Sequence, residues 1–227
     1  MRIRFENQER CMQNVENKKA YPINPPIPEG YFRDVTIEEF FVIQRMSDGS
    51  RFVWISVKSV ESDGTFIKRK VGSKKFISMA FLKNVNLNEA FKKEFALQCE
   101  SVKKYGGFYI SCFYVSKNPD GKPVITKEGE PWNEISYDSA KEIAKMFENT
   151  DKVKSHLLFG SEYDASVDYD FECNKMMMEW TQESKGVGVA CKIVRNSKFI
   201  SQKFPKNIAI NNEKSKDITF RIALWIE

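Results

Sequence analysis

Runs of β-branched and aromatic residues mark the strands that the sequence predicts. Residues 40–44 and 51–57 are two such runs, and the Asp-Gly pair at 48–49 between them is typical of a tight hairpin turn. A second Asp-Gly pair, at 63–64, predicts another hairpin. Residues 108–115 form an apolar run that lies between glycines and turn residues, so we expect a buried central strand there.

Three segments space their apolar residues as a helix does. In 86–99 apolar residues recur every three to four positions after an asparagine that could serve as the N-cap. Ser136 precedes 137–147, which carries an apolar face and predicts the clearest helix of the chain. Ser161 predicts the start of a third helix, over 161–169.

The order of these elements indicates the fold class. The alternating tail, 218–226, predicts a closing strand, and the strands and helices do not follow a repeating β-α period. This order favours an α+β domain over a parallel doubly wound sheet. We expect the domain to span 31–227.

Prolines set the first thirty residues apart from the rest. Proline fixes φ and lacks an amide donor, so 1–30 is expected to form an extended arm that precedes the domain. Such an arm suits docking onto a neighbouring subunit. The residues expected to dock are Tyr21, Pro22, Pro25, Pro26 and Pro28.

Composition and charge point to a soluble, cytoplasmically synthesised protein. No apolar run is long enough to cross a membrane, and the chain starts without the apolar stretch of a signal peptide. The net charge is +5, but acidic residues dominate 148–183 while basic residues dominate 192–216. Opposite-sign surfaces favour contacts with partners or copies, although ordinary solvated surface gives the same pattern. The five cysteines are widely spaced and contain no C-x-x-C pair, so free thiols are expected.

Several short motifs follow one another in a fixed order along the chain. They are 52–57 (FVWISV), 107–114 (GFYISCFY), 131–136 (PWNEIS), 157–163 (LLFGSEY), 178–181 (MEWT), 194–197 (VRNS) and 220–223 (FRIA). Ordered agreement of several weak motifs is more specific than any one of them. In this order the chain resembles the formylglycine-generating enzyme, or sulfatase-modifying factor, family, and most of all its short bacterial and phage-borne members.

The resemblance implies an irregular C-type-lectin-like domain in which the first and last strands pair and long loops carry the binding surface. Catalysis in that family is attributed to a pair of copper-binding cysteines shortly before the terminal strand. Here 199–219 contains no cysteine, and Cys191 stands alone before that region. The iron-dependent branch needs a histidine cluster, whereas His156 is the only histidine. We therefore expect no catalytic residues and no enzyme activity; a diverged metal-dependent oxidase is the alternative.

Acidic residues in and after the third predicted helix raise the question of a metal. Calcium needs six or more oxygen ligands, and the resemblance adds weight because calcium often supports loop-rich folds. The spacing is not that of an EF-hand, so carboxylates that face solvent are the other interpretation. No other cofactor is expected. The candidate calcium ligands are Glu162, Asp164, Asp168, Asp170 and Glu172.

Three further features have competing interpretations. His156 could act as a base or pH switch, but without a partner pattern a structural histidine is favoured. The basic run 67–75, between Phe66 and Phe76, could meet nucleic acid, yet a lysine-rich hairpin edge looks the same, and no nucleic-acid partner is expected. Trp180 is expected in the core. Aromatic residues that could stack on sugar rings are Tyr31, Phe32, Tyr163, Tyr169 and Trp225.

These expectations combine into one functional hypothesis. The chain is expected to be a non-catalytic structural or attachment component of a phage or prophage virion, made in the host cytoplasm. Its partners would be other virion proteins or its own copies, reached through the arm, and a host surface glycan or protein. A free, soluble, cytoplasmic ligand-binding protein is the alternative.

Overall fold

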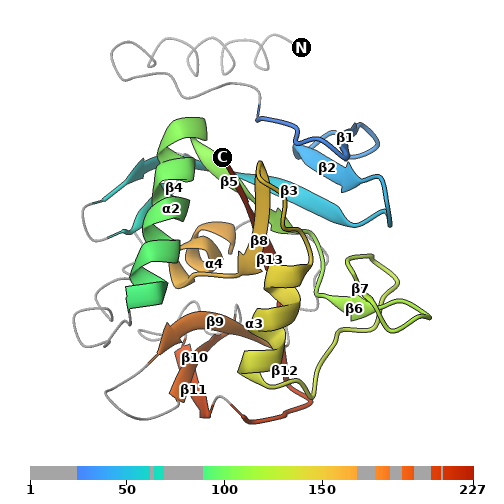
Figure 1. The fold of residues 1–227 in the computed structure, drawn as a ribbon, viewed down its shortest axis with the longest axis vertical. Coiled ribbons are helices and arrows are strands. Elements are labelled where there is room, and N and C mark those ends of the chain that lie inside the picture. Colours follow the sequence, from blue (N-terminus) through green and yellow to red (C-terminus); the bar gives the residue numbers. More distant parts are fainter. Residues whose placement is uncertain are drawn as a thin grey trace, which may run out of the picture.

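The α+β class is confirmed: among the described residues more lie in strands than in helices, and most strand pairs are antiparallel (Figure 1). The computed structural model describes residues 25–61, 64–68, 89–167, 177–184, 191–196, 206–210 and 212–227. Three helices lie within these ranges. None of them is long and apolar enough to cross a membrane.

A seven-stranded sheet forms the main layer. Its order is β1-β2-β3-β5-β13-β8. Strand β2 pairs with the start of β3, at residues 51–53, and β4 pairs with its end, at residues 57–60. Every pair in this sheet is antiparallel. The strands are β1 (Tyr31–Asp34), β2 (Val42–Arg45), β3 (Arg51–Val60), β4 (Phe66–Lys68), β5 (Gly107–Ser111), β8 (Val153–Leu157) and β13 (Ile222–Ile226).

The hairpin between β2 and β3 confirms the turn predicted at 48–49. Gly49 has a φ of 74°, a left-handed conformation that glycine adopts without the penalty of a Cβ atom. The Asp48 carboxylate accepts from the Ser50 amide at 3.0 Å and from the Arg45 guanidinium. Gly64 closes the β3–β4 turn with a φ of 81°, and Asp63 lies outside the described residues.

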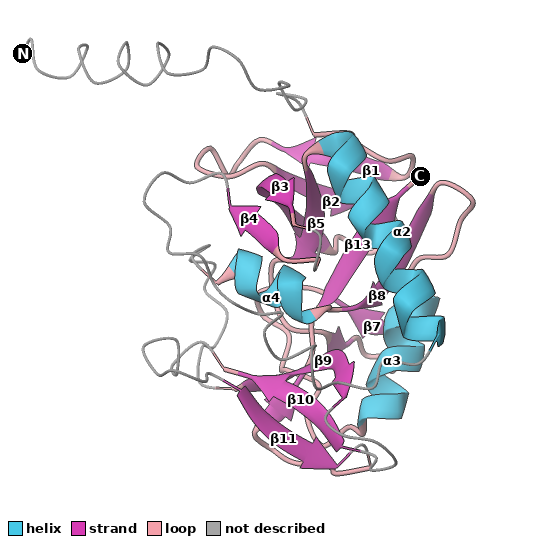
Figure 2. Ribbon diagram, turned by 90° about the vertical axis from the view of Figure 1, so that its left-hand side faces the viewer, coloured by secondary structure: helices cyan, strands magenta, loops and turns pink. Residues whose placement is uncertain are grey.

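The helices are α2 (Glu89–Tyr105), α3 (Tyr137–Met146) and α4 (Gly160–Ser166). Ser136 caps α3 as predicted, because its hydroxyl accepts from the Ser139 amide. Helix α2 continues past the predicted end at 99, since Val102 prolongs its buried stripe. Helix α4 is capped at Phe159 instead of Ser161, whose hydroxyl donates to Gly64 at 3.0 Å. Figure 2 shows α4 between the large sheet and a smaller one.

The smaller sheet has the order β11-β10-β9-β12, with β12 parallel to β9. The predicted closing strand, 218–226, is not continuous. It divides into β12, which belongs to the smaller sheet, and β13, which belongs to the larger sheet. The division falls at Phe220 and Arg221, where the Phe220 carbonyl accepts from Val115 and Arg221 pairs with Glu179. The bounds are β9 (Met178–Ser184), β10 (Cys191–Arg195), β11 (Lys206–Ile210) and β12 (Ile218–Thr219).

Two further expectations about strands need correction. The predicted strand 108–115 ends at Ser111, and a separate hairpin of β6 (Ser116–Lys117) and β7 (Pro123–Val124) follows. Among the described residues the first and last strands do not pair: β1 pairs with β2, while β13 lies between β5 and β8.

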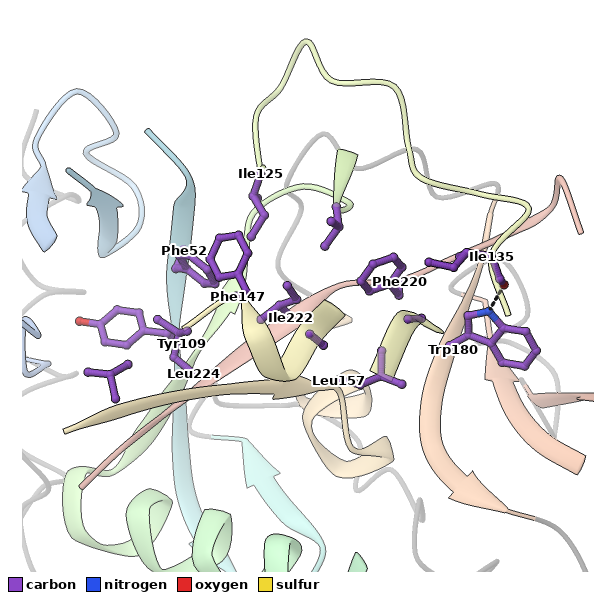
Figure 3. Close-up of a cluster of buried hydrophobic side chains, with 14 of the residues drawn as sticks. Phe52, Tyr109, Ile125, Ile135, Phe147, Leu157, Trp180, Phe220, Ile222 and Leu224 are labelled. Carbon is purple, nitrogen blue, oxygen red and sulfur yellow. Dashed lines mark hydrogen bonds between the residues drawn. The ribbon is translucent and has the colours of Figure 1, made fainter. Parts of the chain in front are cut away.

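Alternation along β3 divides the core into two clusters. Phe52 and Trp54 point into the cluster that α3 covers, while Val53 and Ile55 point into the cluster that α2 and α4 cover. Figure 3 shows the first cluster running from Tyr109 to Trp180. Trp180 is fully buried, as expected of a core residue, and its indole N–H donates to the Ile135 carbonyl at 3.1 Å (Figure 3).

The described end of the arm packs against the chain's own domain. Pro25 and Pro28 are buried, and the Pro26 carbonyl accepts from the Tyr109 hydroxyl at 2.9 Å. Ile27 between them is 46% exposed. Tyr21 and Pro22 lie outside the described residues, so docking of the arm on a neighbour stays a prediction. Pro25 and Pro28, which were expected to take part in this docking, are buried.

Candidate functional site

A cavity of about 200 Å³ opens beside the edge strand β8. The register of β13 on β8 pairs His156 with Ala223 and Lys154 with Trp225, which puts these four residues on the sheet face that α2 covers. Residues of α2 and α3 complete the wall beside these strand residues. The lining residues are Glu94, Gln98, Lys145, Asn149, Lys154, Ser155, His156, Phe159 and Trp225.

One buried carboxylate, that of Glu162, holds the polar side chains Gln98 and His156, which form the floor of this cavity. Glu162 is fully buried in α4, and its two oxygens lie 3.0 and 3.1 Å from His156 Nε2. One oxygen also accepts from the Gln98 amide, and the other accepts from the Phe159 backbone N–H at 2.8 Å. These contacts orient Gln98 and the His156 ring. His156 therefore has the hydrogen-bonded structural role that its sequence context favoured.

The orientation of Gln98 leaves one polar atom without a partner. Its amide nitrogen donates to Glu162, and its amide oxygen, Oε1, is buried with no hydrogen bond. The whole side chain is only 1% exposed. An unpaired buried acceptor costs about 1–3 kcal/mol. Gln98 lines the cavity, so a small rotation of its side chain would let Oε1 meet a donor brought by a ligand.

Charged side chains of both signs surround the mouth. Glu94 on α2 contacts Lys145 at 3.0 Å and Lys141 at 3.8 Å on α3. Burial and the Lys145 charge lower the pKa of Lys141, against the opposing effect of Glu94. On the strand side, the Lys154 ammonium lies 5.0 Å from the centre of the Trp225 ring and 3.4 Å from a Glu227 oxygen.

A second polar cluster, around Tyr163, lies between α4 and the smaller sheet and does not line the cavity. Arg195 pairs with Asp164 at 2.8 Å, and Arg221 pairs with Glu179 at 2.7 Å. Burial raises the pKa of Glu179, although Arg221 opposes this effect. Burial likewise raises the pKa of Tyr163, which lies between both guanidinium groups. The paired charges make this cluster a structural connection between α4 and the smaller sheet.

The described thiols are placed where they react poorly. Cys99 and Cys112 are buried and form no disulfide. Burial raises the pKa of Cys99 to about 12, so its thiol stays protonated at neutral pH. In the part of the chain that the structure describes, no three histidine, cysteine or acidic residues cluster as a metal site.

The five predicted calcium ligands are only partly described. Glu162 and Asp164 lie on the same short helix, but their carboxylates serve different protein donors: His156 and Gln98 for Glu162, Arg195 for Asp164. Asp168, Asp170 and Glu172 lie outside the described residues. A calcium site that uses the whole set stays a prediction.

The aromatic residues that were expected to stack on sugar rings differ in their exposure. Tyr31 is buried and its hydroxyl donates to Glu148, while Tyr163 is buried in the second cluster. Tyr169 lies outside the described residues. Phe32 is 44% exposed on β1, and Trp225 lines the cavity. Trp225 is therefore the described member of the set that the cavity beside β8 brings into a recess.

The basic run is described only at its start. Residues 69–75 and Phe76 lie outside the described residues, while Ile67 and Lys68 are in β4. Phe66 is buried, and its ring stacks on Phe95 at 6.3 Å between centres. Because Phe66 is committed to the core, it cannot stack on a nucleobase.

The sequence interpretation missed Gln98, Glu94 and Asn149 as wall residues. The signal for Gln98 was present: it is a polar residue on the apolar stripe of a helix that also carries Phe91 and Phe95. A polar residue on a core-facing stripe usually has a specific partner. The partner, Glu162, lies 64 residues away along the chain, so spacing alone could not reveal it.

Comparisons with protein-family models, with curated proteins and with solved structures found no match to this chain.

Proposed function

We propose that this chain is a non-catalytic binding module that serves as a structural or attachment component of a phage or prophage particle. The observation that carries the binding role is the cavity beside β8, whose floor is built from polar side chains held by Glu162. A recess with fixed polar groups and an aromatic wall is the usual form of a small-molecule site.

The chemistry of the wall favours binding over catalysis. Among the described wall residues no thiol is present, and the single hydroxyl, on Ser155, is already engaged. It donates to the Ala144 carbonyl at 2.5 Å and accepts from the Glu148 amide at 2.7 Å. A side-chain hydroxyl or thiol must be free and within reach of a base to act as a nucleophile, so among the described wall residues His156 has no such group to activate.

Sequence features support the proposal that the chain belongs to a phage particle. The chain resembles phage-borne members of the formylglycine-generating enzyme family, and its arm is rich in prolines. Because Pro25 and Pro28 pack on the domain, the part of the arm proposed to reach a neighbour is 1–24. An extended chain spans about 3 Å per residue, so 24 residues reach roughly 70 Å.

The test is mass spectrometry of density-purified particles from the producing culture. We expect this chain at a fixed ratio to a major coat protein. A variant lacking 1–24 keeps Pro25 and Pro28, so it should fold but stay in the soluble fraction. Cys191→Ser should assemble as the wild type does. Absence of the chain from particles would overturn the particle assignment, and copper-dependent thiol oxidation by the purified chain would overturn the non-catalytic role.

A further inference from the structure

We infer that the cavity beside β8 binds one neutral sugar ring, in the pyranose form, without calcium. This inference rests on the proposed binding role and adds the class of ligand. The residues that carry it are Gln98, Trp225, Asn149 and the two charged groups Glu94 and Lys145.

The size of the cavity restricts the ligand to a single ring. Its volume is about 200 Å³. Sites for drug-sized ligands have roughly 300–1,000 Å³. A monosaccharide, or the terminal residue of a glycan, fits this smaller volume, whereas a nucleotide or a folded peptide does not.

The polar atoms on the wall ask for a ligand with hydroxyl groups. Gln98 lines the cavity and its buried amide oxygen, Oε1, has no partner, so a small rotation of this side chain would let Oε1 accept from a ligand. His156 uses Nε2 toward Glu162, and its Nδ1 has no partner among the described residues. Asn149 and Lys145 add donors at the mouth. A hydroxyl group both donates and accepts, so a polyol satisfies this mixture of acceptors and donors.

The balance of charge argues for a neutral ligand. Glu94 and Lys145 are paired at 3.0 Å, and Lys154 is near Glu227 at 3.4 Å. An anion would be attracted by the lysines and repelled by Glu94, and a cation would meet the reverse. Because each of these lysines has an acidic partner, neither charged class gains a net attraction there.

Trp225 supplies the contact that selects a ring over a linear polyol. Trp225 lines the cavity, and the Lys154 ammonium is above its ring at 5.0 Å from the ring centre. A pyranose presents a face of C–H groups that packs on an aromatic ring, while a linear polyol has no such face. The floor beneath is held by Glu162, so little ordering would be needed on binding.

The test is a ¹H–¹⁵N titration of the full chain, in EDTA, with the methyl pyranosides of glucose, galactose, mannose and N-acetylglucosamine. We expect at least one to give saturable shifts at Gln98, His156 and Trp225, with a dissociation constant on the order of a millimolar. Glycerol and methyl glucuronide should bind at least about tenfold more weakly.

Variants locate the site. Trp225→Ala should weaken binding about tenfold. Asn149→Ala, which removes a side chain at the mouth and leaves the floor intact, should also weaken it. Phe32→Ala is the matched control, because Phe32 is an exposed aromatic residue on β1, at the opposite edge of the sheet. Each variant must keep the wild-type spectrum outside the site.

Four results would overturn the inference. The first two are no saturable shifts with any pyranoside, and binding that both Trp225→Ala and Asn149→Ala leave unchanged. The other two are tighter binding of methyl glucuronide, and binding that EDTA abolishes. These failures differ from failure of the proposed function. A chain that is stoichiometric in particles but ignores every pyranoside loses only its assigned ligand.

Discussion

Arg195 on β10 donates to Asp164 on α4 at 2.8 Å inside the protein, across 31 residues of sequence. Arg195 is 2% exposed, and its Nε also lies 3.3 Å from the Thr181 hydroxyl. The pair therefore connects the smaller sheet to α4, whose Glu162 holds the cavity residues Gln98 and His156.

Removing one partner of this pair should destabilise the fold strongly. Asp164→Ala leaves the Arg195 charge buried and unpaired, a change that typically costs 3–5 kcal/mol. Urea unfolding measures it. Glu89→Ala, which breaks the exposed pair with Lys92, is the control and should change stability little. The double variant Asp164→Leu/Arg195→Met should recover part of the loss. A single variant no worse than the control would contradict the structural role.

The hairpin at 48–49 should make stability depend on pH in the acid range. Burial by itself would raise the pKa of Asp48, but bonds from Arg45 and from the Ser50 amide hold it below the usual 3.8. A carboxyl with a lowered folded-state pKa stabilises the protein above its unfolded pKa, and this stabilisation is lost as the pH falls through the folded value.

Asp48→Asn tests this expectation. At pH 7 the variant should lose about 1–2 kcal/mol of unfolding free energy, because a charge-assisted bond becomes a neutral one. The gap to the wild type should shrink as the pH falls below about 4. Exposed Asp120→Asn is the control and should show no such convergence. A gap that stays constant between pH 7 and pH 2 would show that the carboxylate charge does not matter.

Local chemistry made part of the fold predictable from the sequence. The turn at Gly49 depends on two adjacent residues, and the cap of α3 depends on Ser136 and a backbone amide three residues on. Both predictions are confirmed because each cause lies within one turn of the chain. Trp180 followed from its place in a motif and is buried as expected.

Contacts between distant residues explain what the sequence analysis missed. The predicted strand 218–226 divides because Val115 and Glu179 bind the residues in its middle, and no local signal marks this. Tyr31 and Tyr163 look like exposed rings in the sequence, yet long-range packing buries both. The candidate site depends on the pairing of Gln98 with Glu162 and on the register of β13 on β8, so it became visible only in three dimensions.

The buried thiols should resist alkylation in the native state. Burial raises the pKa of Cys99 to about 12, so this thiol presents no thiolate at pH 8, and Cys112 is 1% exposed, so an alkylating reagent has little access to it. Iodoacetamide treatment followed by peptide mass spectrometry should leave both unlabelled in buffer and label both in urea. Rapid native labelling of Cys99 would show an accessible thiolate and would reopen the oxidase alternative.

Gly160 should not tolerate even a methyl group. An added Cβ atom would lie 2.6 Å from Arg195 Cζ and 2.6 Å from a Glu183 oxygen, and closer still to a guanidinium nitrogen. Alanine gains up to about 1 kcal/mol over glycine in a helix, whereas overpacking typically costs 1–3 kcal/mol. Arg195 cannot move away because Asp164 and Thr181 hold it. We therefore expect Gly160→Ala to lower the unfolding free energy by about 1–2 kcal/mol.

A double-mutant cycle separates this clash from a general effect of the substitution. In the Asp164→Ala background Arg195 has lost its ion-pair partner and can move, so Gly160→Ala should cost less there than in the wild type. Denaturant unfolding of the four proteins gives the interaction free energy. If the losses of unfolding free energy from Gly160→Ala and Asp164→Ala simply add, the methyl group is accommodated without displacing Arg195. The close approach of α4 to β10 would then not require a glycine at this position.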